Sequence, residues 1–188
     1  MLYFDLQSNL YYKIPFEIYL GMVRDEIMQI SEIVGGDTFY KKFVKRISKE
    51  FDLRDKDSNS KVHVIFQEDE NGDNYVGFCV FGFSDAKMNF WEKTFKEEKW
   101  VSEDYHMIKP SYELMYMYIR PEYRDKGYGS RLFKKAIKFS RENSMKAIYS
   151  YVSDTTNLSL NFYKQMGAKT LIDFSEDEFA TVFLQWIL

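Results

Sequence analysis

A short segment in the second half of the chain carries the residue types of an anion site. Residues 124–132 read RDKGYGSRL and lie between a strand-like run and a helix-like run. Two glycines in a tight strand-to-helix turn leave backbone N–H groups uncovered by side chains, and the positive end of the helix dipole points into the same space. Three basic residues favour the same ligand sign: Arg124, Lys126 and Arg131. The segment therefore predicts a site for a phosphate or pyrophosphate.

Two better-known phosphate motifs are excluded at this segment. A dinucleotide fingerprint needs a third glycine three residues after the second, where this chain has Leu132. A P-loop needs Gly-Lys-Ser/Thr, but Gly127 is followed by Tyr128 and Gly129 by Ser130. A glycine pair can also simply turn a chain. The elements around the turn must decide between an anion site and an ordinary turn.

The bulk composition indicates one soluble domain spanning residues 1–188. Of the residues, 45% are hydrophobic and 29% charged, and the net charge of -3 does not favour nucleic acid. We expect Cys79, the single cysteine, to be a buried core residue rather than a nucleophile. The absence of a possible internal disulfide, a signal peptide or an apolar membrane span favours the cytoplasm. His63 and His106 have no metal-ligand spacing, so no metal is expected.

The first part of the chain predicts helices followed by a hairpin. Apolar spacing and turn residues give these elements: a strand at 2–6, helices at 16–33 and about 37–51, and strands at 61–67 and 75–83 around Asn71-Gly72. Residues 84–110 follow, rich in aromatic and charged side chains, with a short amphipathic helix near 89–97. We interpret 84–110 as an insertion that either covers the sheet or walls a substrate pocket.

The remaining elements alternate between strand and helix. They are strands at 111–120, 147–152, 168–174 and 179–187, and helices at 130–143 and 157–166. A strand–helix–strand unit is right-handed and its strands lie parallel. The glycine turn then falls at the carboxyl end of the first strand, where open α/β sheets bind ligands.

At this point the sequence resembles the GNAT superfamily of acyl-CoA-dependent N-acyltransferases. Two family motifs occur in order: Arg124-x-x-Gly127-x-Gly129, then Asn157 followed by Phe162-Tyr163 and Gly167. The resemblance covers 111–174 well and is only architectural before that. It implies an α/β (α+β) GNAT fold: a mixed, mostly antiparallel sheet of six to seven strands flanked by helices, with a central strand–helix–strand unit.

The resemblance also implies where acetyl-CoA binds, between the strands at 111–120 and 147–152. It implies that the turn amides hold the pyrophosphate, that backbone groups of two strand residues pair with the pantetheine arm and the acetyl carbonyl, and that an asparagine binds the arm. The implied cofactor-binding residues are Arg124, Lys126, Gly127, Tyr128, Gly129 and Ser130 at the turn, Met117 and Ile119 on the strand, and Asn157. Asn157 could instead be only a helix N-cap.

Two side chains are implied as catalytic by the same resemblance. Tyr163 would lie near the sulfur and donate a proton as the thiolate leaves, because a protonated thiol is the better leaving group; the alternative is one more core aromatic residue. Glu113 would take the proton of the amine, through water, because about 13 Å of strand separates it from Met117. An exposed edge glutamate is the alternative. His106 and Tyr112 are weaker candidates for the base.

The function expected from the resemblance is N-acetyl transfer from acetyl-CoA to a primary amine by direct attack in a ternary complex. The alternative is a non-catalytic acyl-CoA-binding regulatory domain. Several acidic residues in or near the insertion would suit a cationic amine, polyamine or lysine: Glu98, Glu103, Asp104 and Glu113. A terminal strand could pair across a two-fold axis, so a homodimer is possible.

Overall fold

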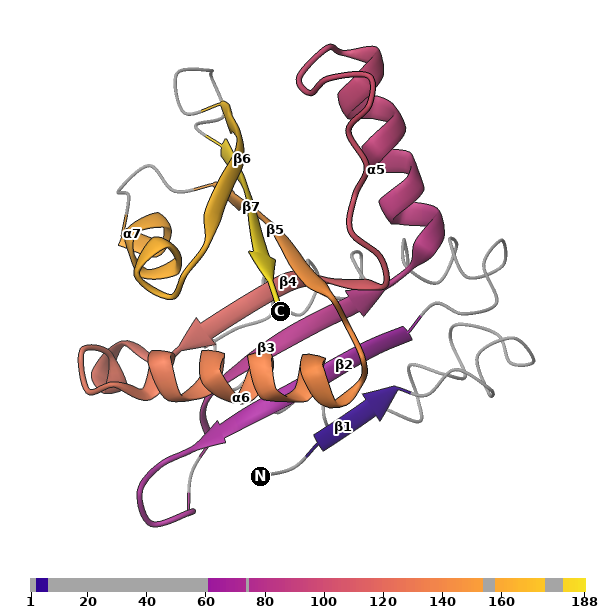
Figure 1. Ribbon diagram of the computed structural model, residues 1–188. Coiled ribbons are helices and arrows are strands. Elements are labelled where there is room, and N and C mark those ends of the chain that lie inside the picture. Colours follow the sequence, from indigo (N-terminus) through magenta and orange to yellow (C-terminus); the bar gives the residue numbers. More distant parts are fainter. Residues whose placement is uncertain (1–2, 7–60, 74, 154–157, 175–180) are drawn as a thin grey trace, which may run out of the picture.

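The computed structural model describes residues 3–6, 61–73, 75–153, 158–174 and 181–188 (Figure 1). The two helices predicted at 16–33 and about 37–51 lie outside these residues, and so does Asn157. In the described part, no helix is both long and apolar enough to cross a membrane. The same residues contain no group of three or more His, Cys, Asp or Glu side chains that could hold a metal ion.

The described strands form one seven-stranded sheet in the order β1-β2-β3-β4-β5-β7-β6. Every neighbouring pair is antiparallel except β4 and β5, which are parallel. The predicted mixed sheet with one central parallel unit is therefore confirmed. The strands are β1 (Tyr3–Leu6), β2 (Lys61–Glu68), β3 (Tyr75–Phe83), β4 (Ser111–Ile119), β5 (Ala147–Ser153), β6 (Lys169–Phe174) and β7 (Thr181–Ile187).

The helices differ from the predicted ones mainly at their first residues. They are α5 (Asp85–Glu97), the 3₁₀ helix η1 (Pro121–Tyr123), α6 (Tyr128–Glu142) and α7 (Leu158–Gln165). Helix α5 begins earlier than predicted because the Ser84 side chain caps it by accepting a hydrogen bond from the Lys87 amide at 3.2 Å. Helix α6 begins at Tyr128 instead of Ser130, which places Gly129 inside its first turn.

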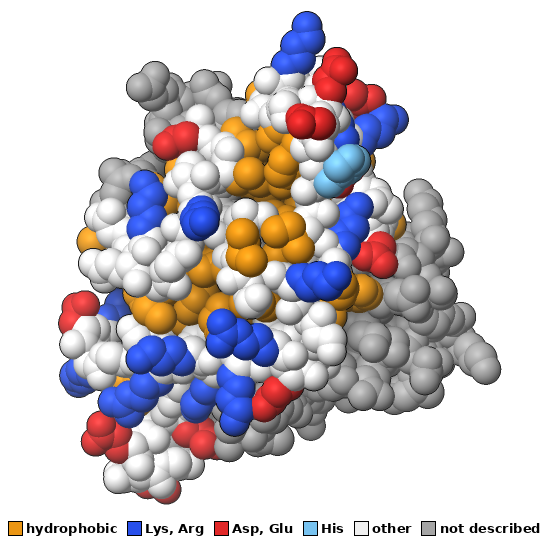
Figure 2. All heavy atoms as spheres, in the orientation of Figure 1, with side chains coloured by type: hydrophobic (Ala, Val, Ile, Leu, Met, Phe, Trp, Pro, Cys, Tyr) orange, Lys and Arg blue, Asp and Glu red, His pale blue; other side chains and the backbone are white. Residues whose placement is uncertain are grey.

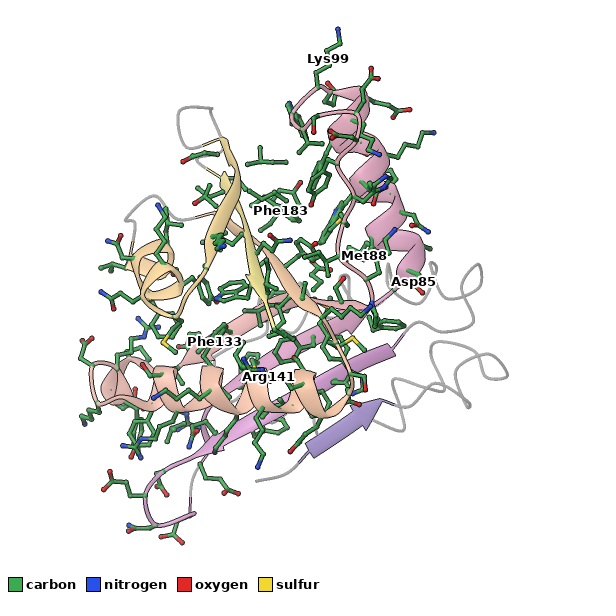
Figure 3. The ribbon with its side chains drawn as sticks, viewed as in Figure 1. Asp85, Met88, Lys99, Phe133, Arg141 and Phe183 are labelled. Carbon is green, nitrogen blue, oxygen red and sulfur yellow. The ribbon has the colours of Figure 1, made fainter. Side chains whose placement is uncertain are left out.

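The two faces of the sheet carry separate cores. Helices α6 and α7 contribute Leu132, Phe133 and Tyr163 to a cluster on one face, which we call the α6 face. Helix α5 contributes Met88, Trp91 and Phe95 to a second cluster on the opposite, α5 face. In Figure 3, Phe133 lies between α6 and the sheet, whereas Met88 lies between α5 and the sheet near Phe183.

The insertion at 84–110 covers the α5 face. The rings of Trp91 and Phe95 pack edge-on against Phe183 of β7, at centroid distances of 5.1 and 4.9 Å. The loop after α5 returns to the sheet, where the Tyr149 hydroxyl accepts a hydrogen bond from the Ile108 amide at 2.8 Å. The covering role expected for the insertion is therefore present.

Glu92 of α5 ties this returning loop to its own helix. Its carboxylate accepts hydrogen bonds from the Met107 amide at 2.8 Å and, when that nitrogen carries the proton, from His106 Nδ1 at 2.9 Å, with Lys109 Nζ at 3.6 Å. Burial opposes ionisation of this carboxyl. The two hydrogen bonds and the neighbouring cations outweigh burial and lower the pKa of Glu92 to about 2.

We expect Glu92→Gln to lower the free energy of unfolding at pH 7 by about 1–3 kcal/mol. A carboxyl whose pKa falls on folding adds stability above its unfolded value, and that stability is lost as the pH falls toward 2. Urea unfolding at pH 7 and pH 3 should therefore show a smaller difference from the natural protein at pH 3. The control is Glu97→Gln on the same helix, whose pair with Lys93 is exposed. An equal loss in both variants would contradict the assignment.

Gly77 of β3 lets the end of β4 approach closely. A Cβ atom at this position would lie 2.5 Å from the Tyr118 carbonyl oxygen and would also overlap the Ile119 side chain. Because the first obstacle is backbone, we expect Gly77→Ala to lower the free energy of unfolding by about 1–3 kcal/mol. Urea unfolding measures this. A variant as stable as the natural protein would mean that β3 and β4 can separate at this point without cost.

Candidate active site

Strands β4 and β5 are paired only at their first residues. Their parallel register runs from Ser111 with Ala147 to Glu113 with Tyr149 and then ends. Figure 1 shows the two strands diverging beyond this point. At the point of divergence, the Ser150 hydroxyl donates a hydrogen bond to the Leu114 carbonyl at 2.9 Å. The rest of β4 therefore has β3 as its partner on one side and no β5 partner on the other.

The direction of the β4 backbone groups follows from the pairing with β3. The Arg120 amide donates to the Val76 carbonyl at 2.9 Å. Because neighbouring residues of a strand point their amides to opposite sides, the Tyr118 backbone groups face β3. Those of Met117 and Ile119 face the side that β5 has left. This placement is the one that the sequence resemblance implied for the pantetheine arm.

An irregularity in β4 lies beside the point of divergence. Val80 pairs with Tyr116 and Phe81 with Leu114, so Met115 is one extra residue in β4. An extra residue bends the strand and increases its twist. It lies two residues after Glu113, so the unpaired segment begins about 7 Å along the strand from that side chain.

The glycine turn follows β4 through η1, and its two glycines have different roles. Gly127 has φ of 80°, a left-handed value that disfavours residues with a Cβ, and it is the N-cap of α6. Gly129 lies in the first helical turn, where an added Cβ would lie 3.4 Å from the Phe162 ring of α7. The sequence treated both glycines as turn residues, but only Gly127 has the turn conformation. Gly129 instead allows α6 and α7 to pack closely.

The N-terminus of α6 presents three backbone amides before its first internal hydrogen bond. That bond is donated by the Arg131 amide to the Gly127 carbonyl at 3.0 Å. The amides of Tyr128, Gly129 and Ser130 precede it and have no intrahelical acceptor. Together with the helix dipole they favour an anion at this end of β4.

Each predicted basic residue at the turn is held by an aromatic ring. Arg124 lies over Tyr118, Lys126 over Tyr123 and Arg131 over Tyr128, at 5.5, 5.6 and 4.6 Å from the ring centroids. Arg124 Nε also donates to the Ile119 carbonyl at 3.0 Å, which links the turn to the end of β4. Figure 2 shows Lys and Arg side chains gathered over α6, so the positive charge extends along the helix.

Tyr163 lies in the core of the α6 face. Its ring packs 5.5 Å from Trp186 of β7 and 6.1 Å from Phe133 of α6. The side chain is nearly buried, and burial raises the pKa of its hydroxyl well above the ordinary value, with the neighbouring Cys79 adding to the effect. The hydroxyl is therefore protonated at every pH at which the protein would work. Such a group can donate a proton but cannot act as a base near neutrality.

Glu113 lies on the opposite, α5 face. It is 2% exposed, so the alternative of an exposed edge glutamate is wrong. Its carboxylate forms an ion pair with Lys87 Nζ of α5. The insertion therefore contributes to the site as well as covering the sheet. Tyr163 and Glu113 approach the divergence of β4 and β5 from opposite faces.

The weaker candidates have other partners. The His106 side chain is 75% exposed and is held by Glu92. Tyr112 is buried on the α6 face, with its hydroxyl 3.3 Å from His63 Nε2. Cys79 is fully buried, and burial raises the pKa of its thiol far above the ordinary value, so it is not a nucleophile.

Sequence reasoning missed three side chains around this site. Lys87 and Trp91 lie far from Glu113 in the sequence, and no spacing could link them to it. Arg120 Nε is buried without a hydrogen-bond partner in the described part of the chain. A donor of this kind at the end of β4 is available to a ligand. The three turn amides, the outward-facing backbone of β4 and Arg120 together fit an extended ligand with an anionic end.

Comparison with protein families decides what this arrangement belongs to. The model of the acetyltransferase (GNAT) family matches residues 26–168. The chain belongs to the GNAT acetyltransferase family. It is therefore an acyltransferase, and acyl-CoA is the co-substrate of the family. The expectation of an enzyme is confirmed over that of a binding domain.

Solved structures of GNAT proteins share the fold. A GNAT-family protein from Desulfovibrio desulfuricans has a TM-score of 0.55 at 11% identity over 99% of this chain and 98% of that chain. The mosquito arylalkylamine N-acetyltransferase like 5b has a TM-score of 0.52 at 12% identity, covering 87% and 96%. The PaiA N-acetyltransferase from Thermoplasma acidophilum, solved with coenzyme A, has a TM-score of 0.46 at 12% identity over 100% of both chains. A search of curated proteins finds no match.

Proposed function

We propose that this GNAT protein transfers the acetyl group of acetyl-CoA to a primary amine by direct attack in a ternary complex. The observation that carries the proposal is the position of the α6 N-terminal amides, at the carboxyl end of a strand whose other edge β5 has left. An anionic ligand end at the turn and an extended arm along β4 would satisfy both sets of backbone groups.

The residues that would hold acetyl-CoA are those of the turn and the outward-facing backbone of β4. The turn amides of Tyr128, Gly129 and Ser130 would bind the pyrophosphate, with Arg124 and Lys126 adding positive charge. The backbone groups of Met117 and Ile119 would bind the arm, and Asn157 is proposed for the arm on the resemblance alone. When bound, acetyl-CoA supplies the acetyl group as a thioester.

Two side chains would move protons. Glu113 would accept a proton from the acceptor ammonium on the α5 face, and the Tyr163 hydroxyl would donate one to the departing sulfur on the α6 face. Buried Cys79 offers no thiolate for a covalent acetyl-enzyme. This supports direct attack over a two-step transfer.

A thermal shift series tests the cofactor first. The purified protein is heated with acetyl-CoA, coenzyme A, ATP and NAD. A ligand at a hundredfold its Kd adds about 2.7 kcal/mol of stability. We expect stabilisation by acetyl-CoA and coenzyme A alone. No shift with either would contradict the proposal, and an equal shift with ATP would mean that the turn binds phosphates without selecting coenzyme A.

A further inference from the structure

The ion pair between Lys87 and Glu113 is a buried ammonium site built into the α5 face. The side chains are 13% and 2% exposed. Lys87 Nζ also lies over the Trp91 ring, 5.2 Å from its centroid. The Trp91 ring packs edge-on against Tyr151 of β5 at 5.5 Å. A carboxylate beside aromatic faces is the chemistry by which proteins recognise alkylammonium ions.

The position of Lys87 on its helix does not favour its charge. Lys87 lies in the first turn of α5, three residues after the Ser84 cap. The helix dipole disfavours a cation at this end. A buried ion pair is also a weak source of stability, because apolar side chains of similar volume often do as well. The pair therefore calls for an explanation other than helix or fold stability.

The location of the pair supplies that explanation. Glu113 is the last β4 residue paired with β5, and the extra residue Met115 follows it at the start of the unpaired segment. The Lys87 ammonium is thus held beside the divergence of the two strands, on the face opposite Tyr163. An amine that approached the thioester from the α5 face would have to pass the same carboxylate.

We propose that Glu113 and Trp91 form the ammonium subsite for the acceptor, and that the Lys87 ammonium occupies this subsite until an acceptor displaces it. The inference rests on the proposed function and names its substrate class. The group seen in the subsite is a primary ammonium on an unbranched alkyl chain, so the acceptor is an alkylammonium of the same kind. Lys87 acts as an internal competitor that excludes weakly bound amines.

The reaction balances without a further reagent. Glu113 takes one proton from the bound ammonium, and the neutral nitrogen attacks the thioester carbonyl carbon. The new N–C bond forms as the C–S bond breaks, and the sulfur receives the Tyr163 proton. The amide nitrogen loses its extra proton to solvent, from which Tyr163 is reprotonated. Alkylammonium and acetyl-CoA thus give the N-alkylacetamide, coenzyme A and one proton.

Chemical complementation of Lys87→Ala tests the subsite without needing transfer. This change removes the part of the side chain that n-butylammonium resembles and leaves Glu113 without the Lys87 ammonium. We expect n-butylamine at pH 7.5 to raise the Tm of Lys87→Ala in a concentration-dependent way, whereas n-butanol should not. The natural protein should not respond. Neither should Lys93→Ala, which removes an exposed lysine of the same helix.

Transfer to n-butylamine gives the second readout. With acetyl-CoA saturating and coenzyme A release followed, removal of the internal competitor should lower the KM for n-butylamine by about tenfold or more. If Lys87→Ala fails to fold, Lys87→Met serves in the same assay, because Met keeps the apolar stem without the charge. A KM equal to that of the natural protein would overturn the proposal. A Tm response to n-butanol equal to that of n-butylamine would do so as well.

The two proposals fail in different ways. If acetyl-CoA stabilises Lys87→Ala and n-butylamine does not, the subsite is wrong and the cofactor site remains. If n-butylamine stabilises the variant and acetyl-CoA has no effect on any form of the protein, the subsite remains and the acetyl-transfer assignment of the turn is wrong.

Discussion

Replacing Tyr163 with Phe is expected to lower kcat by about 10²- to 10⁴-fold. The affinity for coenzyme A should be unchanged. The change removes only the hydroxyl, so the ring can keep its packing against Trp186 and Phe133. Steady-state kinetics with acetyl-CoA and the best amine of a panel measure kcat, and calorimetry measures the affinity. An unchanged kcat would remove the acid role from Tyr163 and leave it as a core residue.

A matched control is available in the insertion. Tyr105 is half-buried, and burial also raises the pKa of its hydroxyl far above the ordinary value. Tyr105→Phe makes the same chemical change on the α5 face and should leave kcat close to that of the natural protein. An equal loss of kcat in both variants would indicate a general structural effect.

The raised pKa of Tyr163 also predicts its alkaline behaviour. A tyrosine that stays neutral in the folded protein contributes stability below its unfolded pKa near 10, and this stability falls as the pH rises above that value. Tyr163→Phe should therefore lose less stability than the natural protein between pH 9 and 11. Urea unfolding at these pH values measures the difference. Parallel curves would mean that Tyr163 ionises as freely in the folded protein as in the unfolded chain.

Replacing Gly127 with Val is expected to weaken coenzyme A binding by about tenfold to a hundredfold, since a β-branched residue at positive φ costs about 1–3 kcal/mol. A Cβ at this position meets no atom within 4 Å. The effect must therefore come from the backbone, which would turn the N-terminal amides of α6 away from the anion. Calorimetric titration with coenzyme A measures the Kd.

The hairpin between β2 and β3 offers the control for this change. Gly72 has φ of 79°, and a Cβ there also meets nothing within 4 Å. Gly72→Val imposes the same backbone strain away from the α6 turn and should lose stability without losing affinity. If both variants keep full affinity, the turn does not hold the anion. If both lose it equally, the loss follows from reduced stability.

Local patterns predicted most of the described fold. Strand alternation and the Asn71-Gly72 turn placed β2 and β3, and the glycine turn placed β4, α6 and their parallel partner β5. The start of α5 was missed because the Ser84 cap precedes several residues without helical periodicity. The start of α6 was missed because Gly127, with its positive φ, ends the turn one residue before the helix. The helices predicted before residue 60 remain predictions.

The site was predictable only where it is local in sequence. The turn residues and the backbone of β4 form one continuous segment, so one motif places them. The surroundings of Glu113 depend on α5, which begins 28 residues earlier, and burial of a glutamate beside a lysine leaves no periodic trace. The roles of Tyr163, Glu113 and Asn157 stay predictions, as do the cytoplasmic location and a homodimer.

The place of β7 between β5 and β6 affects how the chain can assemble. Strand β7 is the last in sequence order but pairs with strands on both sides. Until it docks, β5 has an unpaired edge and β6 has no neighbour in the sheet. The part of the sheet from β2 to β4 can form during synthesis, whereas the half that carries β5 must wait for a late, non-local closure. During this interval the exposed edge of β5 is a site for pairing with another chain, so aggregation competes with the step that completes the enzyme.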